Sequence, residues 1–150
     1  MKKLLITLLV LPLLWAVHAK AQILKPVKWS YAATKTSDIE ATVLLKADIE
    51  ESWHIYSAYQ KDGGPLKTSF KFSPSKAYSL VGKLTEPKPL SVFDKNFGIQ
   101  VDYFEKNVTF QQKIKLKTKQ TTVKGKLEFM ACTKEQCLPP DEINFSIPIN

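Results

Sequence analysis

The chain has 150 residues and a formal net charge of +8, from 22 basic and 14 acidic residues. Every basic residue is a lysine, whereas proteins that read nucleic acids rely on arginine for bidentate contacts with guanine and phosphate. The composition therefore argues against nucleic-acid binding, and the length suits one domain with its own core.

The N-terminus has the layout of a secretory signal peptide. A basic start is followed by an apolar run at residues 4–17, and Ala19 and Ala21 mark a small-x-small cleavage site. The run is interrupted by a proline and is shorter than the roughly 20 residues that a spanning helix needs. We therefore expect residues 1–21 to be removed, leaving residues 22–150 as a soluble, periplasmic domain that does not span the membrane.

The exported part shows the period of two that is typical of half-buried β-strands. The clearest case runs from Ile39 to Ile49, where six apolar residues share one face and polar residues lie opposite. In chain order, strands are expected at 27–31, 39–49, 53–57, 68–72, 78–84, 99–104, 108–116, 123–131 and 143–149. Turn signals such as the Asp-Gly-Gly-Pro run at 62–65 divide them.

Residues 86–98 interrupt this pattern. The stretch contains two prolines, two aromatic residues and a glycine, and it has no clean period. We interpret it as a long ordered loop, which in a compact domain is often functional. A plain crossover between two sheets remains the alternative.

Eight or nine short strands with turns between them, and no helical period outside the leader, predict an all-β protein. The expected fold is an immunoglobulin-like antiparallel β-sandwich in a single domain, and we expect a monomer. A comb of lysines on the outer face of residues 109–117 is interpreted as solvated surface, which also discourages pairing between sheet edges.

Both cysteines lie in one decapeptide, Ala-Cys-Thr-Lys-Glu-Gln-Cys-Leu-Pro-Pro, at residues 131–140. A disulfide between Cys132 and Cys137 would close a very small ring, which contributes only about 2 kcal/mol by the chain-entropy formula. Stability is therefore a weak reason for this spacing, although a structural disulfide stays possible. An oxidising compartment would also join two nearby thiols unless a reductant acts on them, so a cycling pair needs an electron supplier.

The position of the pair suits disulfide exchange. It follows a predicted strand and precedes two prolines, which fix φ and withhold N–H groups from a sheet ladder. We expect this hairpin tip to hold the two sulfurs close together and near the surface, where an incoming disulfide could reach them.

The decapeptide and three upstream segments resemble the N-terminal periplasmic domain of the thiol:disulfide interchange protein DsbD. These segments are residues 53–57, 94–98 and 123–130, and the likeness covers residues 25–150. It implies an immunoglobulin-like domain with protein-disulfide reductase activity and no cofactor. The membrane-spanning and thioredoxin-like domains of that family are not in this chain. We therefore expect a separate membrane electron carrier and thioredoxin-like periplasmic proteins as partners.

The resemblance also implies roles for individual residues. Cys137, which lies beside Leu138 and Pro139, would be the nucleophile that forms the mixed disulfide, and Cys132 would resolve it. Pro139 is expected to belong to the wall or cap of this site. His54 and Tyr56 match aromatic positions that flank the pair in the family.

The segment from Asp94 to Gly98 matches the cap that shields the sulfurs until a partner docks. Asn96 stands where the family usually has phenylalanine, with Phe97 beside it, and Lys95 replaces a second acidic cap residue. The chain also has four residues between its cysteines, whereas better-known members have five.

Two other readings of the cysteines stay open at this point. Cys132, Cys137 and His54 could hold Cu(I) or Zn(II), although three ligands make an incomplete structural zinc site. Alternatively, the chain is an exported β-sandwich that binds another protein and carries a merely structural disulfide.

Overall fold

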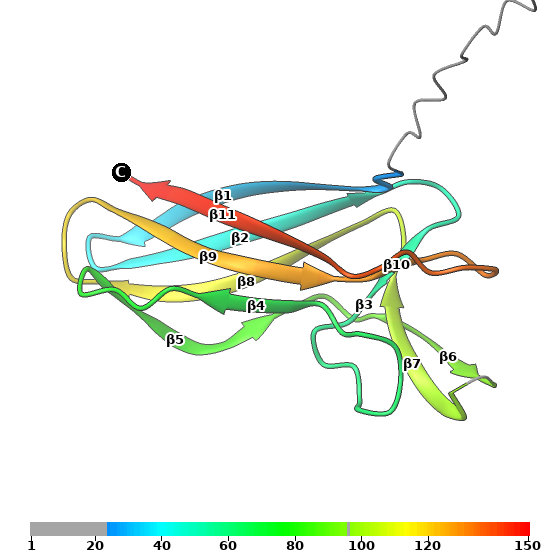
Figure 1. The fold of residues 1–150 in the computed structure, drawn as a ribbon. Coiled ribbons are helices and arrows are strands. Elements are labelled where there is room, and N and C mark those ends of the chain that lie inside the picture. The colour runs from blue at the N-terminus through cyan, green and yellow to red at the C-terminus, as the bar shows by residue number, and fades with distance from the viewer. Residues whose placement is uncertain (1–23, 96) are drawn as a thin grey trace, which may run out of the picture.

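The computed structural model describes residues 24–95 and 97–150, which form β-strands and no helix. Figure 1 shows the strands, which are β1 (Val27–Ser37), β2 (Glu40–Ile49), β3 (His54–Tyr56), β4 (Ser69–Phe72), β5 (Tyr78–Thr85), β6 (Leu90–Asp94), β7 (Ile99–Phe104), β8 (Asn107–Leu116), β9 (Thr121–Phe129), β10 (Ala131–Cys132) and β11 (Asp141–Ile149). No helix able to cross a bilayer occurs in these two ranges. The expected signal peptide at residues 1–21 lies outside the described residues.

Two antiparallel sheets form the body of the molecule. One has the strand order β1-β2-β8-β5 and the other the order β11-β9-β4. Their inner faces carry the alternating apolar residues, among them Phe110, Leu45 and Leu127, which are fully buried. The predicted immunoglobulin-like antiparallel β-sandwich is confirmed.

A third sheet, with the order β10-β3-β7-β6, lies at one end of the sandwich (Figure 1). The predicted strand at 123–131 is divided between two sheets. β9 pairs with β11 and β4, whereas Ala131 and Cys132 of β10 pair with Ile55 and His54 of β3. The chain thus leaves the body of the sandwich at Met130 and carries Cys132 into the end sheet.

Residues 86–98 do not form a loop throughout, so that prediction was wrong for its central part. Leu90–Asp94 is strand β6, which pairs along its full length with β7 and ends the third sheet. Most side chains of β6 are exposed on both faces, so the strand lacks the alternation by which buried strands are found. The prolines lie before the strand rather than within it, as expected for segments that cannot donate to a ladder.

The predicted inner face of residues 39–49 was wrong at its first position. Ile39 lies in the turn before β2 and is exposed, while the inward face begins at Ala41. The first strand is longer than predicted, since β1 extends to Ser37. The last four residues of β1 are exposed and show no alternation, but they still pair with β2.

Candidate functional site

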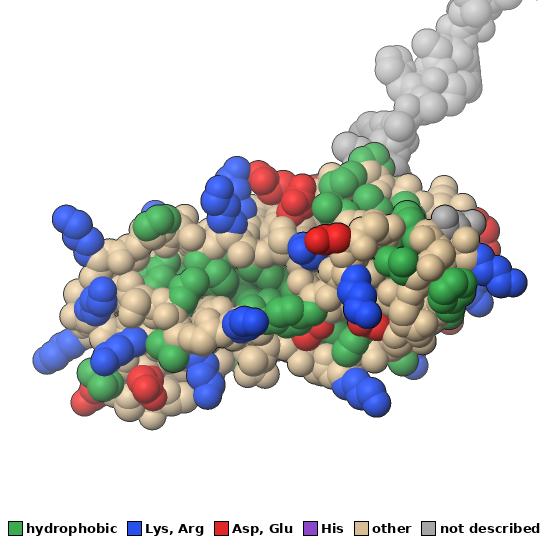
Figure 2. All heavy atoms as spheres, turned by 90° about the horizontal axis from the view of Figure 1, so that it is seen from below, with side chains coloured by type: hydrophobic (Ala, Val, Ile, Leu, Met, Phe, Trp, Pro, Cys, Tyr) green, Lys and Arg blue, Asp and Glu red, His purple; other side chains and the backbone are tan. Residues whose placement is uncertain are grey.

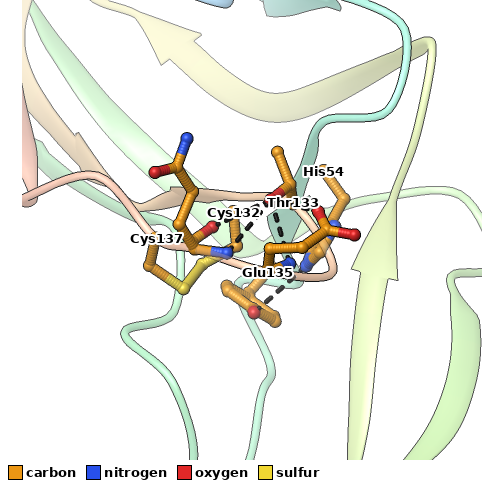
Figure 3. The surroundings of a disulfide bond; sticks show 7 residues. His54, Cys132, Thr133, Glu135 and Cys137 are labelled. Atoms are coloured by element: carbon orange, nitrogen blue, oxygen red, sulfur yellow. Dashed lines mark hydrogen bonds between the residues drawn. A yellow bond between two sulfur atoms is a disulfide. The ribbon is translucent and has the colours of Figure 1, made fainter.

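The two cysteines form a disulfide at a tight hairpin tip, with their Cα atoms 4.0 Å apart. The backbone N–H of Thr133 donates to the carbonyl of Gln136 at 2.7 Å and closes the hairpin. The Thr133 hydroxyl oxygen also accepts hydrogen bonds from the backbone N–H groups of Glu135 and Gln136, both at 3.1 Å (Figure 3). Because the threonine hydroxyl accepts hydrogen bonds from the backbone of its own turn, it favours one conformation of the residues between the cysteines.

Beyond the cysteines, Leu138 anchors the return of the chain. Its backbone N–H donates to the carbonyl of Ala131 at 2.9 Å, and its side chain packs against the main core. Pro139, predicted to belong to the wall or cap of the site, instead lines a separate pocket with Pro26 and Phe129. The structure therefore does not bring Pro139 to the face of the disulfide that meets the cleft described below.

The two sulfur-bearing residues differ sharply in exposure. Cys132 has an exposed fraction of 1% and packs in a small buried cluster with Tyr56 and Val101. Cys137 is exposed. The expectation that both sulfurs lie near the surface was therefore wrong for Cys132, because β10 pairs with β3 and places that side chain inside the end sheet.

Aromatic side chains from β3 and β7 stand beside the disulfide. The His54 ring lies 5.2 Å from that of Tyr56 and 5.1 Å from that of Tyr103, both edge to face. A hydrogen bond of 3.1 Å links Nε2 of His54 to the Tyr56 hydroxyl (Figure 3). His54 and Tyr56, predicted from the resemblance, thus lie together at the site. Tyr103 was missed at the sequence level, because the pattern of residues 99–104 does not show that this strand pairs with β3.

The surroundings keep this histidine and tyrosine neutral at neutral pH. Burial lowers the pKa of His54, an effect that Glu105 and then Asp94 oppose through their negative charges. Burial, assisted by the charge of Asp94, raises the pKa of Tyr56 to about 12. The Tyr56 hydroxyl can therefore donate to an unprotonated Nε2 of His54, and the two side chains form an uncharged wall.

A cleft of about 550 Å³ separates the hairpin tip from the β6–β7 hairpin. Cys137 and residues 133–136 line one side of the cleft. The aromatic side chains of His54, Tyr56 and Tyr103 form its floor. The opposite side is formed by side chains from β6 and the turn that follows it, namely Val92, Phe93, Asp94, Lys95 and Phe97. The exposed cysteine therefore opens into a pocket that a protruding loop of another protein could enter.

The predicted cap lies at the tip of the β6–β7 hairpin. The backbone N–H of Gly98 donates to the carbonyl of Asp94 at 2.8 Å, and Gly98 has a φ of 68°, which favours glycine. Phe97 lines the cleft with an exposed fraction of 44%. Asn96, the position where the family usually has phenylalanine, lies outside the described residues.

If Phe97 shields the two cysteines, removing its side chain should speed the reaction of their thiols with alkylating reagents. We expect Phe97→Ala to raise the alkylation rate of the reduced protein about two- to tenfold, since an aromatic contact is worth about 0.5–1.5 kcal/mol. Leu90→Ala is the matched control, because Leu90 is 50% exposed on the same hairpin but does not line the cleft. Stopped-flow alkylation measures both rates, and an unchanged rate for Phe97→Ala would remove this residue from the cap.

Polar side chains connect β7 and the segment before β6 to residues 57–60, which follow β3. Gln60 is buried, and its Oε1 accepts a hydrogen bond of 2.7 Å from the backbone N–H of Asp102. The Glu86 carboxylate accepts hydrogen bonds from the Ser57 hydroxyl and, at 2.9 Å, from the backbone N–H of Ala58. These residues were missed at the sequence level, because isolated polar residues in loops carry no period that predicts their burial.

The described residues contain no cluster of three or more His, Cys, Asp or Glu side chains that could hold a metal ion. The two sulfurs are bonded to each other, and a metal site would need them as free thiolates.

Comparison with known proteins agrees with this geometry. The family model described as thiol:disulfide interchange protein DsbD, N-terminal, matches residues 20–148. The chain belongs to this family. Membership of the DsbD N-terminal family and a disulfide between the two cysteines both fit thiol–disulfide exchange. No curated protein sequence is similar enough to this chain to count as a match.

Several solved structures share the fold. The DsbD N-terminal domain of Neisseria meningitidis in its reduced form matches with a TM-score of 0.54 at 19% identity, covering 80% of this chain and 85% of that chain. The N-terminal periplasmic domain of ScsB from Proteus mirabilis matches with a TM-score of 0.54 at 19% identity, covering 82% of this chain but only 44% of that chain.

A third match is a complex between the DsbD N-terminal and PilB N-terminal domains of Neisseria meningitidis. Its TM-score is 0.53 at 17% identity, covering 83% of this chain and 87% of that chain. At these identities the likeness shows the immunoglobulin-like fold and nothing finer.

Proposed function

We propose that this chain is a periplasmic thiol–disulfide exchange protein that passes reducing equivalents from a membrane or thioredoxin-like donor to oxidised exported proteins. The observation that carries the proposal is the asymmetric disulfide, with Cys137 exposed in a cleft and Cys132 buried behind it. Exchange needs one sulfur that a partner can reach and a second that stays close enough to complete the reaction.

The proposed reaction starts from the reduced protein. The Cys137 thiolate attacks one sulfur of the target disulfide, forming a mixed disulfide and releasing the first target thiolate. Cys132 then gives up its proton, and its thiolate attacks the Cys137 sulfur and releases the second target thiolate. The target gains two electrons and becomes a dithiol after protonation, while the chain returns to the Cys132–Cys137 disulfide.

Reduction of the chain follows the same route in reverse. A donor thiolate attacks the exposed Cys137 sulfur, the bond to Cys132 breaks, and a second donor thiol releases the reduced chain. The solved complex of the DsbD N-terminal and PilB N-terminal domains supports a partner that is a separate folded domain. The family membership supports a thioredoxin-like carrier for that role, and the expected leader at residues 1–21 supports the periplasm as the compartment.

A redox titration tests this function. We expect the pair in the purified mature protein to have a midpoint between about −180 and −270 mV in glutathione buffers, the range of proteins that exchange disulfides. Trapping thiols with an alkylating agent and weighing the products by mass spectrometry gives the reduced fraction at each potential. A pair that stays oxidised well below about −300 mV would instead identify a structural disulfide and the protein-binding alternative. Copper or zinc in anaerobically purified protein would favour the metal-binding alternative.

A further inference from the structure

A second surface feature lies away from the cysteines, where the two main sheets end in β4 and β5. A groove of about 380 Å³ runs between these strands, and its lining includes Phe70, Phe72, Leu80 and Leu84. Figure 2 looks onto this side of the molecule and shows hydrophobic side chains at the bottom of a hollow, with lysine side chains around it. On the opposite side of the sandwich β1 lies against β11, whereas no comparable contact joins β4 and β5 among the described residues.

The apolar floor consists of inward-facing residues that no strand covers. Leu80 pairs with Ile114 on the inner face of its sheet, and Ile114 is almost fully buried. Leu80 nevertheless has an exposed fraction of 46%. A core-facing leucine left nearly half open to water forgoes part of the stabilisation that burial gives, so covering it would be favourable.

Both walls of the groove are free strand edges. Among the described residues, β4 pairs only with β9, and β5 pairs only with β8. One edge of each strand therefore keeps backbone N–H and C=O groups that another extended chain could pair with, apart from the carbonyl of Leu84, which accepts a hydrogen bond from the Tyr59 hydroxyl. The β5 edge is braced from behind, because the buried Gln112 donates from Nε2 to the carbonyl of Val81 at 3.1 Å.

The rim of the groove is positively charged. Residues 69–85, which contain β4, β5 and the link between them, include Lys71, Lys76 and Lys83 and no acidic residue. Lys83 itself lines the groove. Glu86, the next acidic residue along the chain, is occupied by its hydrogen bonds to Ser57 and Ala58. An occupant with acidic side chains would therefore complement this rim.

We propose that this groove binds an extended segment of another protein in which apolar and acidic residues alternate. The segment adds a strand to the β4 or β5 edge, its apolar side chains cover Leu80 and the phenylalanine rings, and its acidic side chains face the lysines. A polypeptide fits better than an anionic lipid, because only a polypeptide pairs with a row of free backbone groups. None of the groove residues lines the cysteine cleft, so this binding site does not depend on the redox function.

The test uses a labelled, end-blocked decapeptide of alternating valine and glutamate and the mature protein, with fluorescence anisotropy as the readout. We expect saturable binding that weakens about fivefold or more in Leu80→Gln, the loss typical of an anchor residue. Val81→Gln is the matched control. Val81 has a similar exposed fraction, 43%, but lies next to Leu80 on the outer face, so its loss should change the affinity less than about twofold.

A peptide in which lysine replaces glutamate should bind at least about tenfold more weakly, because it meets the same lysine rim. The proposal is overturned if the valine–glutamate peptide does not bind the wild-type protein, or if both substitutions weaken it equally. Vesicles of anionic phospholipid that bind with the same dependence on Leu80 would also overturn it in favour of a lipid site. The redox titration of the same samples should stay unchanged, which separates this result from the proposed exchange function.

Discussion

Replacing Cys132 with alanine is expected to trap a mixed disulfide through Cys137. The exposed Cys137 sulfur can still attack an oxidised partner, but the buried sulfur that would release the partner is gone. Resolution within the complex is fast because the second sulfur is held at a high effective concentration, and without it we expect about tenfold or more trapped product. Cys137→Ala should trap little, because Cys132 is hidden from the partner.

The experiment expresses each variant in the periplasm, quenches with acid, alkylates free thiols and separates adducts on non-reducing gels. Mass spectrometry then identifies the trapped protein, for which we expect a thioredoxin-like periplasmic carrier. The variant with both cysteines replaced is the control for non-covalent association. Adducts found only with Cys137→Ala would reverse the roles of the two sulfurs, and adducts with neither single variant would refute exchange through this pair.

Gly125→Ala is expected to destabilise the whole domain. Gly125 lies in β9 between Phe145 of β11 and Phe72 of β4. A Cβ atom at this position would approach Cζ of Phe145 to 2.4 Å and the backbone carbonyl oxygen of Lys71 to 2.6 Å. Neither contact is tolerable, so both the buried ring and strand β4 must shift. Overpacking of this kind costs about 1–3 kcal/mol of unfolding free energy.

Urea denaturation of the oxidised protein, followed by tryptophan fluorescence, measures this loss. Ser146→Ala is the control, because Ser146 is exposed on the neighbouring strand β11 and its loss should change the unfolding free energy by less than about 0.5 kcal/mol. If Gly125→Ala matched the wild-type stability, Phe145 would not be packed over this glycine. A second consequence can be checked on the same variant, since movement of β4 should also weaken peptide binding in the groove.

The candidate site could be predicted only in part. Cys132, Cys137, His54 and Tyr56 come together as the resemblance implies, and Phe97 lines the same cleft. Pro139 does not, because the chain turns at Leu138 toward the main core and takes the proline to another surface. The cleft also contains residues that no motif singled out, because a wall is formed by whichever strands become neighbours.

Residue patterns alone establish the fold class and the position of the cysteine hairpin along the chain. Alternating apolar residues distinguish the two faces of each long strand, and this pattern is the same whichever strands become neighbours. Three features emerge only when distant strands pack together: which sulfur is buried, the strand at residues 90–94, and the open groove between the β4 and β5 edges. This division arises because a local pattern encodes only which side of a strand is apolar. Which strands pair, and which edges remain free, depends on contacts between residues far apart in the chain.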